Sequence, residues 1–246
     1  MITIVHGRVR LALHQLRGRA SEDSRLARPA TSEDSRLARP ATSKNSRANL
    51  LLLHGLGEHS PTAVPAALSS WLGPVAALDM TGHGSSSIPA GGGYSCEVLM
   101  ADVDCALAEL GPCTIMGRGL GGYVGLLIAG ARSSLVRGLI IDDGPGLAGG
   151  GVRPGSTLLA VPDAAVRPDG DGTPDPYALL ELSTDIRPPD YAQNFVHMAL
   201  QGPLDEPISV CGISRPPWLS AVVECYGVRT EPLAVALARF AAISAV

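Results

Sequence analysis

Residues 113–122 read CTIMGRGLGG, and they carry the clearest signal of the fold in this sequence. Its first four residues form a short apolar run that is typical of a buried strand. A glycine-rich turn follows at residues 117–122, and residues 123–131 have the apolar composition of a buried helix. A strand that passes through such a turn directly into a helix is the repeating unit of a parallel α/β sheet.

The same unit recurs on both sides of this stretch. Apolar runs that indicate buried strands occupy residues 50–53, 75–78 and 136–141, and helical spacing occupies residues 64–72 and 96–110. The alternation predicts an α/β fold with a mostly parallel central sheet and helices on both faces. Ligands of such sheets bind at the carboxyl ends of the strands, where the glycine-rich turns also fall.

The remaining segments extend this single domain over residues 1–246. Residues 2–13 predict an N-terminal β-hairpin. Residues 18–47 contain the unit SEDSRLARPAT twice in succession, and its proline and mixed charge favour a flexible loop. Residues 147–206 predict a small helical lid inserted into the domain. A further strand is expected at 207–213 and a closing helix at 231–242.

Composition excludes several classes of protein. Hydrophobic residues make up 46% of the 246 residues, as in a folded domain, and the net charge is −4. This charge offers no basic surface for nucleic acid and no polybasic stretch for a membrane. No apolar run reaches the roughly 18 residues of a membrane span, and the first ten residues do not resemble a signal peptide. The five cysteines have no C-x-x-C spacing, which favours free thiols in a cytoplasmic protein.

Three strand-end motifs resemble the α/β-hydrolase superfamily, and its esterases in particular. They are HGLG at residues 54–57, DMTGHG at residues 79–84 and GRGLGG at residues 117–122, and they follow one another in the order of that family. The resemblance implies that the first turn, with His54, Gly55 and Leu56, supplies one amide of an oxyanion hole, and that Leu120 supplies the second. It also implies that residues 117–121 are the nucleophile elbow, and that no metal or organic cofactor is needed.

The sequence departs from this family at the nucleophile. The nucleophile position is occupied by Gly119, which has no side chain that could attack a substrate. No histidine follows His197, so the expected C-terminal catalytic histidine is missing. Asp143 remains as a candidate acid. We expect a pseudoenzyme, or a non-covalent hydrolase of a small acyl compound in which Asp143 or His197 acts as general base.

Two other functions stay open. Residues 117–122 also satisfy G-x-G-x-x-G, and Asp142 lies about twenty residues further on, as in a dinucleotide-binding oxidoreductase. Gly119 also favours a non-enzymatic protein on this fold that binds a small, partly apolar ligand or acts as a scaffold. The sequence does not predict the oligomeric state.

Overall fold

The computed structural model describes residues 1–18, 48–150 and 172–243. Almost all of the predicted repeat loop, and residues 151–171 of the predicted lid, lie outside the described residues.

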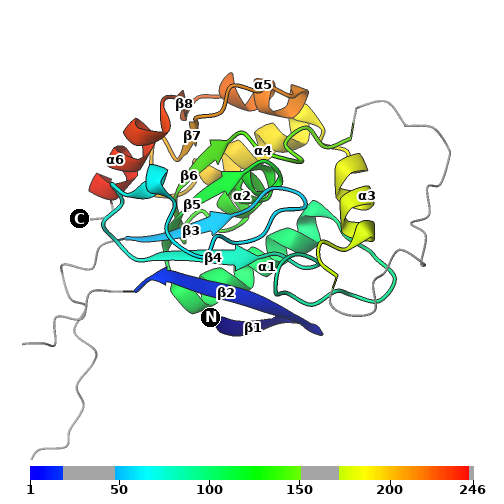
Figure 1. The fold of residues 1–246 in the computed structure, drawn as a ribbon. Helices are drawn as coiled ribbons and strands as arrows, with labels where there is room; N and C mark the ends of the chain where they lie inside the picture. The colour runs from blue at the N-terminus through cyan, green and yellow to red at the C-terminus, as the bar shows by residue number, and fades with distance from the viewer. Residues whose placement is uncertain (19–47, 151–171, 244–246) are drawn as a thin grey trace, which may run out of the picture.

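A single sheet of eight strands organises the molecule, in the order β1-β2-β4-β3-β5-β6-β7-β8 (Figure 1). β1 and β2 pair antiparallel through a tight turn at Gly7, and β2 pairs antiparallel with β4, whereas all other neighbours are parallel. The predicted hairpin and parallel sheet are therefore confirmed. The strands are β1 (Ile2–His6), β2 (Val9–Arg17), β3 (Asn49–Leu53), β4 (Val75–Asp79), β5 (Cys113–Arg118), β6 (Val136–Asp142), β7 (Ile208–Val210) and β8 (Val228–Thr230).

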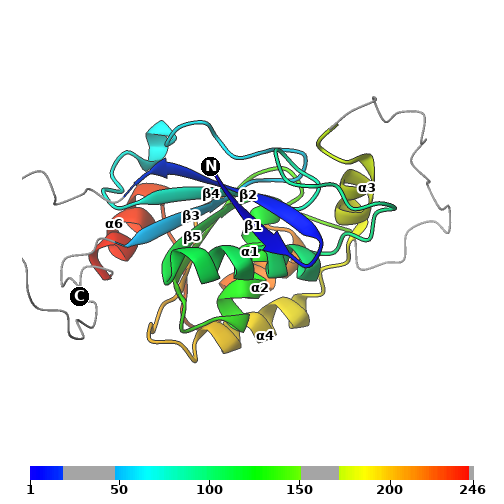
Figure 2. The ribbon, with the colours of Figure 1, turned by 90° about the horizontal axis from the view of Figure 1, so that it is seen from below.

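Helices cover both faces of the sheet. On one face α1 (Cys96–Leu110) and α2 (Leu120–Ala131) lie side by side, with α4 (Pro189–Ala199) and α5 (Pro217–Val223) beside them (Figure 2). Of the described helices, α6 (Leu233–Ile243) and a short 3₁₀ turn, η1 (Ala66–Leu68), lie on the other face. The strands contribute side chains to two separate hydrophobic cores, because successive residues of a strand point to opposite faces of the sheet.

The predicted helix over residues 64–72 is wrong. Only η1 forms there, and its hydrogen bonds join residues three apart, as in the bond from the Trp71 amide to the Leu68 carbonyl. Pro65 has no amide hydrogen to donate, and Leu72 is exposed although the helical pattern expects it in the core. This face of the sheet is therefore covered largely by irregular chain.

The predicted lid divides into two parts. α3 (Pro176–Thr184) stands at the carboxyl edge of the sheet, where the Glu181 carboxylate accepts hydrogen bonds from the amides of Gly93 and Tyr94 (Figure 1). α4 instead packs against α2 and α5 as part of a regular helix layer. The strand β8 was not predicted as a separate element, because its three residues are too few to show a period. No described helix has the length and apolar content needed to cross a bilayer.

Candidate functional site

The nucleophile elbow of the resembled family has its counterpart between β5 and α2. Gly119 follows the last residue of β5, lies buried, and has φ +57° and ψ −120°. A residue with a side chain is strained in this conformation, whereas glycine adopts it freely. The backbone therefore makes the sharp turn of an elbow at the position where the sequence supplies no nucleophile.

A carbonyl oxygen of the chain itself occupies the position between the two expected oxyanion amides. The amide of Leu56 donates to the Pro145 carbonyl at 3.0 Å, and the amide of Leu120 donates to the same oxygen at 2.9 Å. Both distances are those of ordinary N–H···O hydrogen bonds. The two donors that would stabilise a substrate oxyanion are thus already paired with Pro145.

Glycines allow Pro145 to come this close. A Cβ atom added at Gly119 would overlap the Pro145 carbonyl oxygen and lie 2.6 Å from the carbonyl carbon of Gly144. One added at Gly55 would lie 2.9 Å from Cδ of Pro145. Any larger residue at position 119 would have to move residues 144–145 before its side chain could reach a substrate.

Further contacts fix the segment of residues 144–147, which we call the Pro145 loop. The amide of Gly119 donates to the Asp142 carbonyl at 3.0 Å. The Arg187 guanidinium donates to the carbonyls of Gly146 and Leu147, and the indole of Trp218 donates to the Leu147 carbonyl at 2.8 Å. The loop is therefore held from both sides by buried donors, and its carbonyl at Pro145 is a built-in part of the fold.

Asp143 lies next to the elbow in the chain, but its carboxylate points elsewhere. Its two oxygens accept hydrogen bonds from the amides of Ile213 at 2.6 Å and Ser214 at 3.0 Å. The Ile213 amide is the main cause that holds the pKa of Asp143 below its usual value. A carboxylate that is stabilised in its charged form is a weak proton acceptor. In this arrangement Asp143 anchors the loop after β7.

The structure does not bring His197 to the elbow. His197 is exposed near the C-terminal end of α4, a helix that packs on α2 and α5. β8 is followed by Glu231, whose carboxylate accepts hydrogen bonds from Arg239 and Ser209. The described residues include all six histidines of the chain, and none of them follows β8.

His54 joins two of the strand-end turns. Its Nε2 accepts a hydrogen bond from the Met80 amide at 3.1 Å, so its Nδ1 carries the proton and donates to the Gly55 carbonyl at 2.8 Å. Burial lowers the pKa of His54 to about 4, and the neighbouring ring of His83 adds to this effect. His54 is therefore neutral at pH 7 and serves the turns as a structural hydrogen-bonding group.

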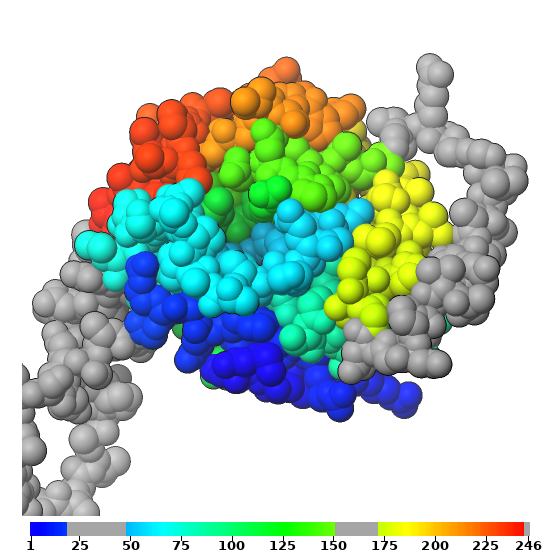
Figure 3. Space-filling model, viewed as in Figure 1, coloured from blue at the N-terminus to red at the C-terminus, as the bar shows by residue number. Residues whose placement is uncertain are grey.

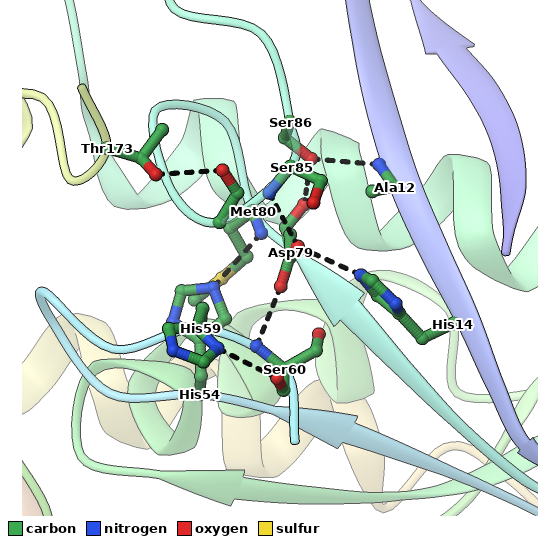
Figure 4. A network of polar contacts seen from close by, with 11 residues as sticks. Ala12, His14, His54, His59, Ser60, Asp79, Met80, Ser85, Ser86 and Thr173 are labelled. Atoms are coloured by element: carbon green, nitrogen blue, oxygen red, sulfur yellow. Dashed lines mark hydrogen bonds and ion pairs between the residues drawn. The ribbon is translucent and has the colours of Figure 1, made fainter. Parts of the chain in front are cut away.

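Asp79 is the centre of a network of polar contacts beside His54 (Figure 4). The predictions from the sequence assign it no role. Its buried carboxylate accepts hydrogen bonds from the amides of Ser60 at 2.7 Å and Ser85 at 2.8 Å, and contacts Nε2 of His14 at 2.9 Å. Burial alone would raise its pKa, but these amides outweigh that effect and hold the pKa below its usual value. An acid at the end of a fully apolar strand was the signal for this role.

The backbone amides at the start of α2 already have acceptors within the protein, so they are not free to bind a dinucleotide. A pyrophosphate would need the free amides of a helix N-terminus. Here Leu120 donates to Pro145, Gly121 to the His54 carbonyl at 3.1 Å, and Gly122 to the Gly119 carbonyl at 3.0 Å. The dinucleotide alternative, with Asp142 on a ribose, therefore has no phosphate site at this turn.

The described residues also bear on metal binding and on thiol chemistry near the elbow. Within residues 1–18, 48–150 and 172–243, no group of three or more His, Cys, Asp or Glu side chains could hold a metal ion. The five cysteines are free thiols. Burial raises the pKa of Cys113 to about 12, and likewise that of Cys211, so both are protonated and poor nucleophiles at neutral pH.

Comparisons with known proteins agree with this fold. A sequence model of the alpha/beta hydrolase family matches residues 50–245. No curated protein matches the chain. Among solved structures, the thioesterase domain from the curacin biosynthetic pathway is 16% identical with a TM-score of 0.59, and the match covers 99% of this chain and 96% of that one.

Two further solved structures illustrate the range of similar proteins. The monoacylglycerol lipase of Paleococcus ferrophilus is 19% identical with a TM-score of 0.51, over 81% of this chain and 96% of that one. An enzyme that degrades N-acyl homoserine lactones is 17% identical with a TM-score of 0.41, over 60% of this chain and 47% of that one. The chain thus spans about half the length of that last enzyme, and at these identities the likeness shows the fold alone.

Proposed function

Because the chain belongs to the alpha/beta hydrolase family, we propose that it is a member that performs no covalent hydrolysis and uses the fold to bind a ligand. The observation that carries this proposal is the Pro145 carbonyl, which accepts hydrogen bonds from both Leu56 and Leu120. An acyl-transfer enzyme needs such donors free for the oxygen that becomes negatively charged in the transition state. Opening the hole would first break two hydrogen bonds inside the protein.

The absence of a nucleophile supports the same proposal. Gly119 has no attacking group, and the Pro145 loop fills the space into which a side chain would project. The non-covalent route is also poorly supported, because both oxygens of Asp143 accept backbone amides and His197 is exposed on α4. A general base must come within hydrogen-bond reach of the reacting group, and neither residue is directed toward Gly119.

Hydrolysis of a short-chain p-nitrophenyl ester by the pure protein tests the proposal. We expect no release of p-nitrophenol above the buffer rate from the native chain, while a serine esterase of the same fold serves as positive control. The variants Asp143→Ala and His197→Ala give the same background rate if the proposal holds. Turnover by the native protein that disappears in either variant would show a working, rearranged active site and overturn it.

A further inference from the structure

A cavity on the α6 face of the sheet lies beside the closed elbow. It has a volume of about 570 Å³ and lies between β3, β5, the irregular segment of residues 57–68 and the start of α6. Figure 3 shows the surface hollowed where the segment of residues 57–68 passes in front of these strands. This volume falls within the range of small-molecule sites, roughly 300–1,000 Å³.

Irregular chain and the turn η1 form one wall of the cavity. Residues 57–68 pass over β3 and β5 as irregular chain, and the side chains beneath do not fill the space. The floor is apolar and includes Leu52, Leu68, Met116 and Leu233. A ligand for this site therefore needs an apolar body, since contact with such a floor removes apolar surface from water.

The charged side chains of the lining indicate which polar group the ligand carries at its other end. Arg118 forms an ion pair with Glu58 at 3.2 Å, and the Glu58 carboxylate also accepts the Gly55 amide at 3.0 Å. This cation and this anion compensate each other. Asp142 lines the same cavity and lies beside Arg118 across the β5–β6 ladder, but among the described residues it forms no ion pair, and its Oδ1 accepts the amide of Asp143. The described lining thus holds one arginine and two carboxylates, which leaves one negative charge in excess.

We propose that this cavity binds a small apolar molecule carrying a protonated amine, with the apolar body on Leu52, Met116 and Leu233 and the ammonium group at the carboxylate of Asp142. Charge complementarity with Asp142 favours a cation over an anion of the same shape. This inference rests on the ligand-binding part of the proposed function and names the ligand class, but it does not depend on the absence of covalent hydrolysis, because the cavity does not include Gly119 or Pro145.

Calorimetric titration with three probes of matched shape tests this proposal: 4-phenylbutylamine, 4-phenylbutanol and 4-phenylbutyrate. We expect the amine to bind about tenfold more tightly than the alcohol, which corresponds to about 1.4 kcal/mol, and the carboxylate to bind more weakly than both. Asp142→Asn keeps an oxygen for the Asp143 amide but removes the charge, so it should remove the tenfold preference and leave the affinity for the alcohol unchanged.

Two control variants locate the binding event. Asp104→Asn removes a carboxylate on α1, where Asp104 pairs with Arg132 at a distance of 2.7 Å, and should leave all three affinities unchanged. Ala67→Trp places a large side chain from η1 into the lining and should abolish binding of all three probes. Equal affinity for amine and alcohol, tighter binding of the carboxylate, or no binding of any probe at millimolar concentration would overturn the proposal. None of these outcomes bears on ester hydrolysis, so the two proposals can fail separately.

Discussion

Asp79 and Pro145 each close a turn at the carboxyl edge of the same sheet, but they use different atoms. Asp79 gathers two backbone amides and His14 with an ionised side chain. Pro145 gathers two backbone amides with a main-chain carbonyl, which carries no charge and cannot be removed by substitution. The first network depends on one side chain and on its ionisation, whereas the second depends on glycines that let the backbone approach.

The comparison explains how the elbow can lose its chemistry while the surrounding turns keep their shape. The turn that contains Asp79 is held within the fold and needs no ligand. The elbow at Gly119 is likewise held by contacts within the protein, because the Pro145 loop supplies the hydrogen-bond acceptor that a substrate would otherwise provide. A separate substitution can disrupt each of the two turns.

The largest effect is expected from Asp79→Ala. This substitution leaves the buried amide of Ser60 and the partly buried amide of Ser85 without their acceptor, and each such loss costs about 1–3 kcal/mol. We expect the free energy of unfolding to fall by about 4 kcal/mol, measured by urea denaturation. Asp104→Ala, which breaks a half-exposed ion pair with Arg132, should cost less than about 1 kcal/mol. A similar loss in both variants would show that the Asp79 network contributes nothing special.

A smaller loss is expected from Gly119→Ala. The methyl group suffers the strain of a backbone conformation that side chains rarely adopt, and it also collides with the Pro145 loop; together these effects cost about 3 kcal/mol. Gly111 is the control without a collision, because it also has a positive φ (+72°, with ψ −162°) but an added Cβ meets nothing within 4 Å. Gly111→Ala should therefore show the strain alone. Equal destabilisation of the two variants would mean that the Pro145 carbonyl does not fill the space beside Gly119.

The pH dependence of stability reports on the buried side chains of the strand-end turns, because the Pro145 carbonyl does not titrate and His54 does. The pKa of His54 is lowered from 6.5 to about 4, so the unfolded chain binds a proton first as the pH falls. The resulting stability is fully present above pH 6.5 and is lost progressively toward pH 4. Between pH 7 and pH 5 we expect a loss of about 2 kcal/mol from His54, to which His83, with its pKa also lowered by burial, adds in the same direction.

The variant His54→Asn isolates this contribution, because asparagine takes no proton in this range. Its free energy of unfolding, measured at pH 7 and pH 5, should fall by about 2 kcal/mol less than that of the native protein. All other titrating groups are shared by the two chains and cancel in the difference. Parallel pH profiles would contradict a neutral, buried His54.

The sequence predicted the architecture well because each central strand is an apolar run that ends in a glycine-rich turn. Residues 113–122 fold as expected, with Gly119 at positive φ between β5 and α2. Residues 64–72 were misjudged because Leu68 and Trp71 have helical spacing, although Pro65 and the exposed Leu72 do not support a helix. Strand β8 is too short for any period to appear in its sequence.

The candidate site was predictable only in part. The two amides of Leu56 and Leu120 do converge on one point, but no sequence pattern shows that the Pro145 carbonyl occupies it, because a carbonyl is present in every residue. The orientation of Asp143 toward Ile213 and Ser214 depends likewise on a loop about 70 residues further along the chain. Such contacts depend on tertiary packing and leave no local signal.

The most direct test of the central claim is an NMR measurement of scalar couplings across hydrogen bonds, between the amide nitrogens of Leu56 and Leu120 and the carbonyl carbon of Pro145. We expect both couplings, together with the control coupling from the Gly121 amide to the His54 carbonyl in the same turn. If the control coupling is observed and both couplings to Pro145 are absent, the two amides are free, and the elbow is open to a substrate.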